Sequence, residues 1–451
     1  MKKVQFENHF SLKVLSGNYK SLLSFLSEKR QSDVIPPEFI NDAIEKMWGE
    51  KISPEEHVLR IIDYVKKNKD EAVNKYSQLF DKSEYDRIEV TQDEIREAFD
   101  LISAEQIEAI EFTINRIRQY HIRQLAHGPV SFSERGTGMI VRPLQRVGIY
   151  MTGSDASLPS SIIHATIPGV VAGVNEIYGV TSAMHNGKVN PLKLVAAQLS
   201  GIQKIFRASG PQSIAAFAFG TESIPAVDKI FGPGNLFVTL AKQQLFGKVG
   251  IDALYGPTET LIIADSSASV DLVAADLLAQ AEHDQLATPL LITDSADLAS
   301  AVVEAVEMQL KTLDREAIAR VAIANGKAIV VNDLYEAISL ANEYAPEHLC
   351  LLVEKPKELI PSIVNAGGIF VGESSPEVLG DYTAGPSHIM PTGGSARYSS
   401  PLSVLDFLKI TSIIEFDDHE IYRQGPYASE LARSEGLTGH ARSLEMRIEG
   451  N

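Results

Sequence analysis

Hydrophobic residues are distributed along the chain in two alternating patterns. Short continuous apolar runs begin near Arg146 with VGIYM and recur in EIYGVTSA, IQKIFRAS, TLIIAD, TPLLITD, KAIVVND, LCLLVE and GGIFVGE. Between most of them lie stretches with a helical period, including residues 158–173, VDLVAADLLAQAEH and residues 297–312. Apolar runs separated by helices are typical of strands buried on both faces of a parallel sheet. The pattern therefore predicts an α/β fold with two successive βαβ arrays, that is, two parallel-sheet domains.

The two ends of the chain lack this alternation. Residues 1–25 are expected to form an arm. Residues 36–125 are charged and place their apolar side chains near a 3.6-residue period, which predicts a helical layer. After about Ser400 the pattern is helical again and predicts a small tail domain.

Charge and composition exclude several classes of partner and compartment. The 59 acidic and 41 basic residues give a formal charge of −18 without a Lys/Arg-rich run, so nucleic acid and anionic membranes are poor partners. The start, MKKVQFENHF, lacks the apolar stretch of a signal peptide, and nothing approaches about 20 uninterrupted apolar residues. The single cysteine, Cys350, excludes intrachain disulfides and multi-cysteine metal sites. We expect a cytoplasmic protein.

Two pairs of polar residues stand at the ends of predicted elements. Gln280 and His283, in LLAQAEHDQ, are three residues apart and leave one face of the predicted helix, which suits two metal ligands. A solvent-facing helix end explains them as well. Glu347 and His348, in YAPEHLC, follow Pro346 at the mouth of a predicted strand, where both can accept protons in one cleft. A solvated glutamate beside a core-edge histidine is the alternative.

Two glycine-containing segments carry further candidates. Asp381 and His388 lie in EVLGDYTAGPSHIMPTGG, a loop that specific turns must shape, and such loops often line sites. An Asx turn and a backbone hydrogen bond are the alternative roles. Glu435 and His440 lie near the end of the chain in SEGLTGHARS, which a surface tail explains equally well.

Glycine also occurs in three predicted turns that could contact a dinucleotide. These are GPGN at residues 232–235, GPTE at 256–259 and the turn at 150–154, where glycine permits close backbone approach. None of them is a G-x-G-x-x-G fingerprint, so ordinary turn chemistry is an equal alternative.

Taken in order, GPGN, LLAQAEH, APEHL, GDYTAGPSHIMPTGG and EGLTGH resemble the histidinol dehydrogenase family. The similarity runs from roughly Arg142 through Ile448, with a weaker match in the N-terminal helices. The resemblance implies oxidation of L-histidinol to L-histidine through the aldehyde with two NAD, the last steps of histidine biosynthesis. It also implies two incomplete Rossmann-like parallel-sheet domains, a helical N-terminal layer and a small C-terminal helical tail domain.

The resemblance also implies a role for individual residues. One Zn2+ per subunit would be bound by Gln280, His283, Asp381 and His440, while Glu347 and His348 carry out the proton transfers. The residues that match substrate contacts are Thr258, Gln280, His283, Glu347, His348, Asp381, His388, Glu435 and His440. Those that match NAD contacts are Tyr150, Gln212 and Asn235. Thr258 stands where the family usually has serine, which keeps the hydroxyl and adds a methyl group.

Two segments depart from the family pattern on the cofactor side. Where the family commonly has Pro-Gly-Gly, this chain has Thr152, Gly153 and Ser154 followed by Asp155, whose charge is unfavourable beside a pyrophosphate. The family's Gly-Gly-Ala-Gln is replaced by a segment in which Pro211 stiffens the loop. Both changes bear on cofactor affinity or preference.

The family is a homodimer whose C-terminal tail completes the partner's site, so Glu435 and His440 are expected to act in trans. The expected domains are an arm at 1–25, a first α/β domain of 26–144 with 256–400 that carries the zinc and catalytic residues, a cofactor domain of 145–255, and a tail of 401–451.

Two alternative functions stay open from the sequence. A sister dehydrogenase on the same scaffold would oxidise another small alcohol, such as a sulfonated diol, but an anionic sulfonate fits poorly beside the Glu435 carboxylate. A non-catalytic zinc-binding homologue would have lost NAD affinity through the altered turn at residues 152–155.

Overall fold

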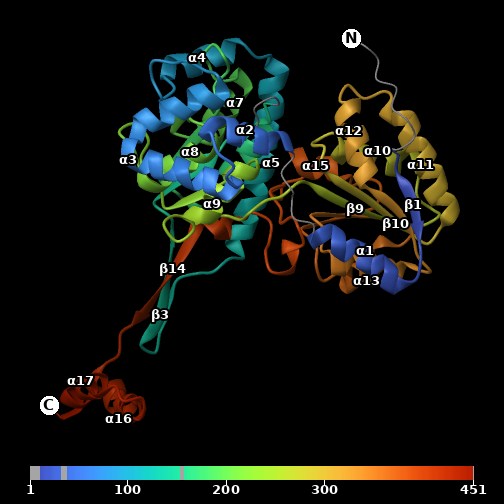
Figure 1. The fold of residues 1–451 in the computed structure, drawn as a ribbon. Helices are drawn as coiled ribbons and strands as arrows, with labels where there is room; N and C mark the ends of the chain where they lie inside the picture. The colour runs from blue at the N-terminus through green and yellow to red at the C-terminus, as the bar shows by residue number, and fades with distance from the viewer. Residues whose placement is uncertain (1–10, 32–37, 153–156, 450–451) are drawn as a thin grey trace.

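The structure, a computed structural model, describes residues 11–31, 38–152 and 157–449. Two α/β bodies lie next to each other, and a long arm leads from one of them to a pair of C-terminal helices (Figure 1). Each body contains a parallel sheet, so the predicted fold class is confirmed. Of the altered turn at residues 152–155, Gly153, Ser154 and Asp155 lie outside the described residues.

The first body is built on a six-stranded parallel sheet. Its strands are β1 (Lys13–Ser16), β9 (Glu259–Ala264), β10 (Thr288–Thr293), β11 (Lys327–Val330), β12 (His348–Leu352) and β13 (Gly368–Val371). Its helices are α1 (Tyr19–Gln31), α10 (Val270–Ala281), α11 (Ala296–Leu310), α12 (Glu316–Asn325), α13 (Leu334–Tyr344), α14 (Pro356–Leu359) and α15 (Glu377–Tyr382). The strand order is β1-β11-β10-β9-β12-β13, and β1 shows that part of the expected N-terminal arm is an edge strand.

Helices cover both faces of this sheet (Figure 1). Leu261 and Ile263 of β9 belong to the core shared with α1 and α13, whereas Ile262 and Ala264 belong to the core shared with α10 and α11. Successive residues of a strand point to opposite faces, so a strand covered on both sides carries apolar residues at every position. This explains the continuous apolar runs of the sequence.

The second body is built on a five-stranded parallel sheet in the order β6-β5-β4-β7-β8. Its strands are β4 (Arg146–Tyr150), β5 (Glu176–Thr181), β6 (Lys204–Arg207), β7 (Lys229–Phe231) and β8 (Gly250–Ile251). Its helices are α6 (Pro159–Ala172), α7 (Pro191–Ser200), α8 (Gly210–Phe219) and α9 (Leu236–Leu245). These bounds agree with the predicted βαβ series between residues 146 and 245.

The helical N-terminal layer is confirmed, but it covers a different body from the one expected. Its helices are α2 (Glu38–Trp48), α3 (Pro54–Asp81), α4 (Gln92–Asp100) and α5 (Ala104–Ala126). Helix α3 packs on α8 and α9, α4 on α7, and α5 on α6. The expected grouping of residues 26–144 with 256–400 is therefore corrected for α2 to α5, because the apolar stripe of α3 is buried in the core of the second body, whereas Leu26 of α1 lies in the core of the first.

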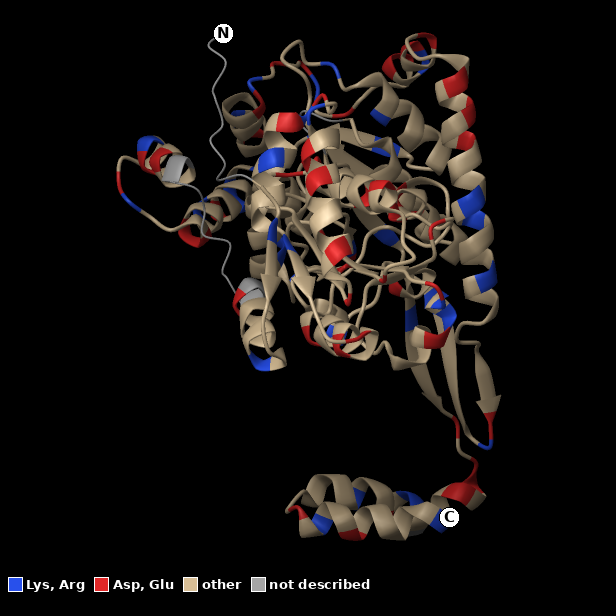
Figure 2. Cartoon of the chain, turned by 90° about the vertical axis from the view of Figure 1, so that its right-hand side faces the viewer, with Lys and Arg blue, Asp and Glu red and all other residues tan. Residues whose placement is uncertain are grey.

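A three-stranded antiparallel arm leaves the second body. It consists of β2 (Phe132–Glu134), β3 (Thr137–Pro143) and β14 (Leu408–Ile414), and β3 pairs with β14 along its whole length. The prediction of a helical pattern after about Ser400 is wrong for residues 408–414, because LKITSII forms a strand through its pairing with distant residues. The chain ends in α16 (Asp418–Ser434) and α17 (Thr438–Glu449), which pack on each other. Both views show this pair standing apart from the two bodies (Figure 1, Figure 2).

Among the described residues, no helix is both long enough and apolar enough to cross a membrane.

Candidate active site

The catalytic candidates Glu347 and His348 lie at the amino-terminal end of β12. Helix α13 stops at Tyr344 because Ala345 adopts a left-handed conformation, with φ 57°, and Pro346 follows it. The chain then enters the sheet, where the backbone N–H of Gly368 donates to the carbonyl of Glu347 at 2.8 Å. Both side chains are buried, so the alternative of a solvated glutamate is excluded.

His348 is held in a single tautomer. Its Nδ1 lies 3.1 Å from the backbone carbonyl of Glu259, so Nδ1 carries the proton and donates it to that carbonyl. Nε2 is buried without a hydrogen-bond partner and keeps its lone pair. Burial lowers the pKa of His348 to about 4, which keeps the ring neutral. A neutral imidazole with a free lone pair is the form that accepts a proton.

Glu347 shares its environment with Thr258. The Thr258 Oγ1 atom lies 2.8 Å from Glu347 Oε2 and 3.2 Å from Gln280 Oε1, and its single proton can serve only one of them at a time. The backbone N–H of Glu259 also donates to Glu347 Oε2, at 3.1 Å. Burial raises the pKa of the Glu347 carboxyl well above its usual range, despite these two hydrogen bonds. Thr258 thus links the proton-transfer pair to the candidate metal ligand Gln280.

Three of the four candidate zinc ligands come from the same region. Gln280 is in the last turn of α10, and the backbone N–H of His283 donates to its carbonyl at 3.2 Å, so His283 lies just beyond the helix end rather than within the helix. Gln280 Nε2 donates to Asp381 Oδ2 at 3.3 Å. Asp381 belongs to the short helix α15 and not to the expected loop. Burial raises the pKa of Asp381 to about 7.

His388 adjoins Asp381. Its Nδ1 lies 2.8 Å from the Asp381 backbone carbonyl, so this nitrogen is the donor and Nε2 keeps its lone pair. Burial lowers the pKa of His388 to about 4, so the ring is neutral. The backbone hydrogen bond expected as the alternative role is therefore present, and it leaves the other nitrogen available.

Glu435 and His440 lie far from this cluster. Glu435 caps the end of α16 and His440 is in α17, and both side chains are exposed on the separate helix pair (Figure 1). Within residues 11–31, 38–152 and 157–449, no cluster of three or more His, Cys, Asp or Glu side chains is arranged to hold a metal ion. Of the four candidate zinc ligands, His440 of the same chain therefore stands apart from Gln280, His283 and Asp381.

The three NAD candidates gather at the carboxyl ends of the strands of the second sheet. Tyr150 ends β4, and its hydroxyl accepts from the backbone N–H of Gly210 at 3.2 Å. Gln212, in α8, is fully buried and both of its side-chain polar atoms lack partners. Asn235 caps α9 with its side-chain oxygen, which leaves its amide N–H groups free. The carboxyl edge of a parallel sheet is where such folds bind nucleotides.

The GPGN turn approaches Tyr150 closely. A Cβ at Gly232, whose φ is +105°, would lie 2.6 Å from the Tyr150 carbonyl, so only glycine fits. The buried ammonium of Lys242 donates to the Gly232 carbonyl at 2.7 Å and to Asp252 Oδ1 at 2.5 Å, and Asp252 Oδ2 accepts from the Gly232 N–H. This ion pair fixes the turn that leads to Asn235.

Two buried carboxyl groups near the site, those of Glu259 and Glu377, were not among the candidates predicted from the sequence. Glu259 follows Thr258, and burial raises its pKa to about 7. Glu377 lies one helical turn before Asp381, accepts from Thr260 Oγ1 at 2.6 Å, and has a pKa raised by burial to about 8. The only signal was an acidic residue at the start of an apolar strand and another at the start of a short helix.

Glu377 should make stability depend on pH. Its pKa in the folded chain is raised, so its contribution is full below about pH 4.5 and is lost as pH rises through about 8. We expect the free energy of unfolding to fall between pH 6.5 and pH 8 by about 1 kcal/mol per pH unit from this group. Glu377→Gln, which keeps an oxygen for Thr260, should reduce this slope in urea titrations, and an unchanged slope would contradict the assignment.

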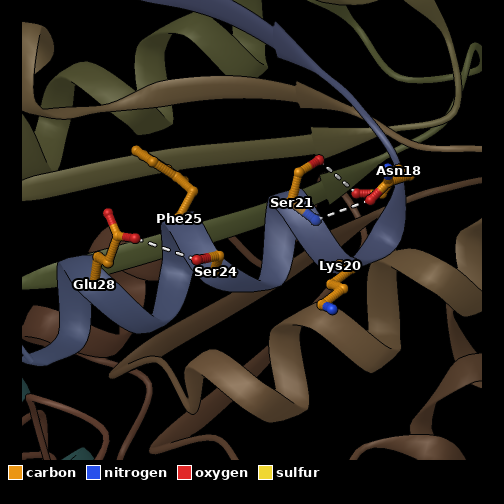
Figure 3. A pocket seen from close by; sticks show the side chains of 6 residues that line it. All are labelled: Asn18, Lys20, Ser21, Ser24, Phe25 and Glu28. Carbon is orange, nitrogen blue, oxygen red and sulfur yellow. Dashed lines mark hydrogen bonds between the residues drawn. The ribbon is translucent and has the colours of Figure 1, made fainter.

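Two surface hollows lie away from these residues. One, of about 530 Å³, lies over α1 (Figure 3). Along its lining, the Ser21 backbone N–H donates to Asn18 Oδ1, the Ser21 hydroxyl donates to the Asn18 carbonyl, and the Ser24 hydroxyl donates to Glu28 Oε1. The other, of about 760 Å³, lies between α2 and α3 and is lined by aromatic and basic side chains, including Trp48 and Tyr64. The candidate active site is therefore identified by its converging buried polar groups and not by either of these hollows.

Comparisons with known proteins agree on one family. The model of the family described as histidinol dehydrogenase matches residues 48–448. A histidinol dehydrogenase of Dehalococcoides mccartyi is 46% identical over 88% of this chain and 92% of its own length. That of Deinococcus radiodurans is 44% identical over 93% and 96%. A solved structure of histidinol dehydrogenase from Elizabethkingia anophelis superposes with a TM-score of 0.89 at 33% identity, covering 99% of each chain.

Proposed function

This chain belongs to the histidinol dehydrogenase family, and we propose that it oxidises L-histidinol to L-histidine with NAD at the cluster around Glu347 and His348. It is an NAD-dependent oxidoreductase, as its family is. The observation that supports this site most strongly is the buried Nε2 atom of His348, which has no hydrogen-bond partner and lies 4.0 Å from Asp381 Oδ1.

In the first oxidation His348 is the general base. An alcohol carbon releases hydride only as its hydroxyl proton departs, and NAD, when bound, accepts that hydride. The Glu259 carbonyl orients the imidazole by accepting from Nδ1, so the lone pair of Nε2 is the available proton acceptor. Because burial lowers the pKa of His348 to about 4, the ring is unprotonated across the neutral range.

In the second oxidation Glu347 activates water. The aldehyde must add water to become a gem-diol before a second hydride can leave. A carboxylate buried beside Thr258 is a stronger base than an exposed one, because burial raises its pKa. Both steps then take place in one buried site, which keeps the reactive aldehyde away from solvent.

A zinc ion would be held by Gln280, His283, Asp381 and His440. The donor chemistry fits, because an amide oxygen, a carboxylate and two imidazoles are ligands that zinc accepts in proteins. A cation would also favour the ionised form of Asp381, which burial otherwise disfavours. When bound, the metal would orient the substrate through its amino and imidazole nitrogens.

The helix pair α16–α17 is proposed to complete the site of a second copy of this chain. It stands apart from both bodies and exposes large apolar side chains, among them Tyr427 at 76% and Leu431 at 66% (Figure 2). Two short helices cannot bury enough apolar surface alone, so a partner must cover them. In the resulting homodimer, Glu435 and His440 would reach the site of the partner subunit.

One experiment tests the substrate and the metal together. We expect the purified protein to reduce NAD with L-histidinol, to lose that activity after chelation, and to recover it with Zn2+. Activity that survives complete chelation would contradict the zinc proposal alone. Reduction of NAD with sulfopropanediol but not with L-histidinol would favour the sister dehydrogenase, and no NAD binding at millimolar concentration would favour the non-catalytic homologue.

Replacement of Glu347 by glutamine should separate the two oxidations. We expect the rate with L-histidinal to fall about a hundredfold, while alcohol oxidation is partly retained, because His348 is still present. Rapid-quench measurement of aldehyde and acid during one turnover checks this, since the aldehyde should accumulate. Equal loss in both steps would show that Glu347 is not specific to the second one.

A further inference from the structure

A buried histidine of the second body lies directly behind His388. His164 is in the middle of α6, in the mostly apolar stretch SIIHATIPG, and is fully buried. Its ring stacks on that of His388, with ring centres 4.3 Å apart and planes inclined by 15°. A polar side chain inside an apolar helix needs a reason, because burial without hydrogen bonds is costly.

Two contacts tie His164 to the segment that carries His388. The backbone N–H of His388 donates to His164 Nδ1 at 3.3 Å, and the hydroxyl of Ser387 donates to the His164 carbonyl at 3.4 Å. Because Nδ1 accepts, the proton of the neutral ring is on Nε2. His164 thus contacts His388 through both the ring face and the backbone.

The orientation of His388 is fixed from two sides. The Asp381 carbonyl holds the edge of its ring by accepting from Nδ1 at 2.8 Å, and His164 holds the face. Together they leave the lone pair of His388 Nε2 as the acceptor for an N–H group. Both amino and imidazole groups of an amino-alcohol substrate offer such donors.

We propose that His164 is a positioning residue that orients His388 to accept a hydrogen bond from an N–H group of the substrate. This rests on the proposed role of His388 as a substrate contact. His164 belongs to α6 of the second body, whereas Asp381 belongs to α15 of the first. A residue of the second body would therefore orient a substrate-binding side chain beside the first.

Three substitutions separate the two contacts. His164→Phe keeps the ring stack and loses the acceptor, His164→Asn keeps an acceptor and loses the ring, and His164→Leu loses both. We expect KM for L-histidinol to rise about tenfold in the leucine variant and less in the other two, with kcat within about twofold of the unaltered enzyme. Thr166→Val is the matched control, because Thr166 is buried in the same helix and its hydroxyl has no partner.

A double-mutant cycle with His388→Ala distinguishes the possible failures. If His164 acts through His388, His164→Leu should raise KM in the normal background and leave it unchanged in the His388→Ala background. An unchanged KM in His388→Ala would contradict the substrate contact itself. A raised KM in His388→Ala with an unchanged KM in all three His164 variants would overturn the present proposal alone, as would equal effects of His164→Leu in both backgrounds.

Discussion

Replacement of His348 by asparagine is expected to lower the rate of hydride transfer from L-histidinol about a thousandfold. In the unaltered chain the Glu259 carbonyl accepts a hydrogen bond from His348 Nδ1 at 3.1 Å, and an asparagine amide can still donate to it. It offers no basic nitrogen at the position of Nε2. The alcohol proton then has no acceptor with a suitable pKa, and the hydride cannot leave. NADH formation under single-turnover conditions measures this step directly.

Metal content and a second buried histidine provide the controls for this variant. His348 is not among the proposed ligands, so bound zinc should be unchanged. His57→Asn removes another buried histidine, which lies in the N-terminal layer and accepts from the Trp48 indole at 2.8 Å. It should leave hydride transfer intact. Full NADH production by His348→Asn would refute the assignment of the base.

The sequence predicted the two sheets well because their signal is local. In β9, β10 and β12 the positions between the strand ends are apolar except Thr260, and helices cover both faces. The arm could not be predicted in the same way. The segment 408–414 forms a strand only because residues 137–143, about 270 positions earlier, pair with it.

The site was only partly predictable for the same reason. Glu347 and His348 stand together in the sequence, but their hydrogen bonds go to Thr258 and to the backbone of Glu259, on another strand. His164 carried no catalytic motif, because its role depends on a loop more than 220 residues away. Short motifs therefore marked the groups that react, and not the groups that orient them.

The proposed role of the helix pair α16–α17 in a second copy of the chain can be tested by complementation between two inactive variants. If His440 acts in trans, a subunit with His348→Asn and a subunit with His440→Asn are each inactive alone but complement each other when co-expressed. Random pairing makes about half of the dimers mixed, and one of the two sites in each mixed dimer is intact. The mixture should therefore regain about a quarter of the activity of the unaltered enzyme.

Co-expression of the unaltered chain with a chain that carries both substitutions gives the reciprocal result. In a trans arrangement a mixed dimer has no intact site, because the unaltered body meets the altered tail and the altered body meets the unaltered tail. Only dimers of two unaltered chains are active, so about a quarter of the activity is retained. In a cis arrangement every normal chain keeps its site, so about half is retained, and the two single variants would not complement. The trans arrangement is favoured because His440 lies on the exposed helix pair, outside the site of its own chain. That site has only Gln280, His283 and Asp381 of the proposed ligands.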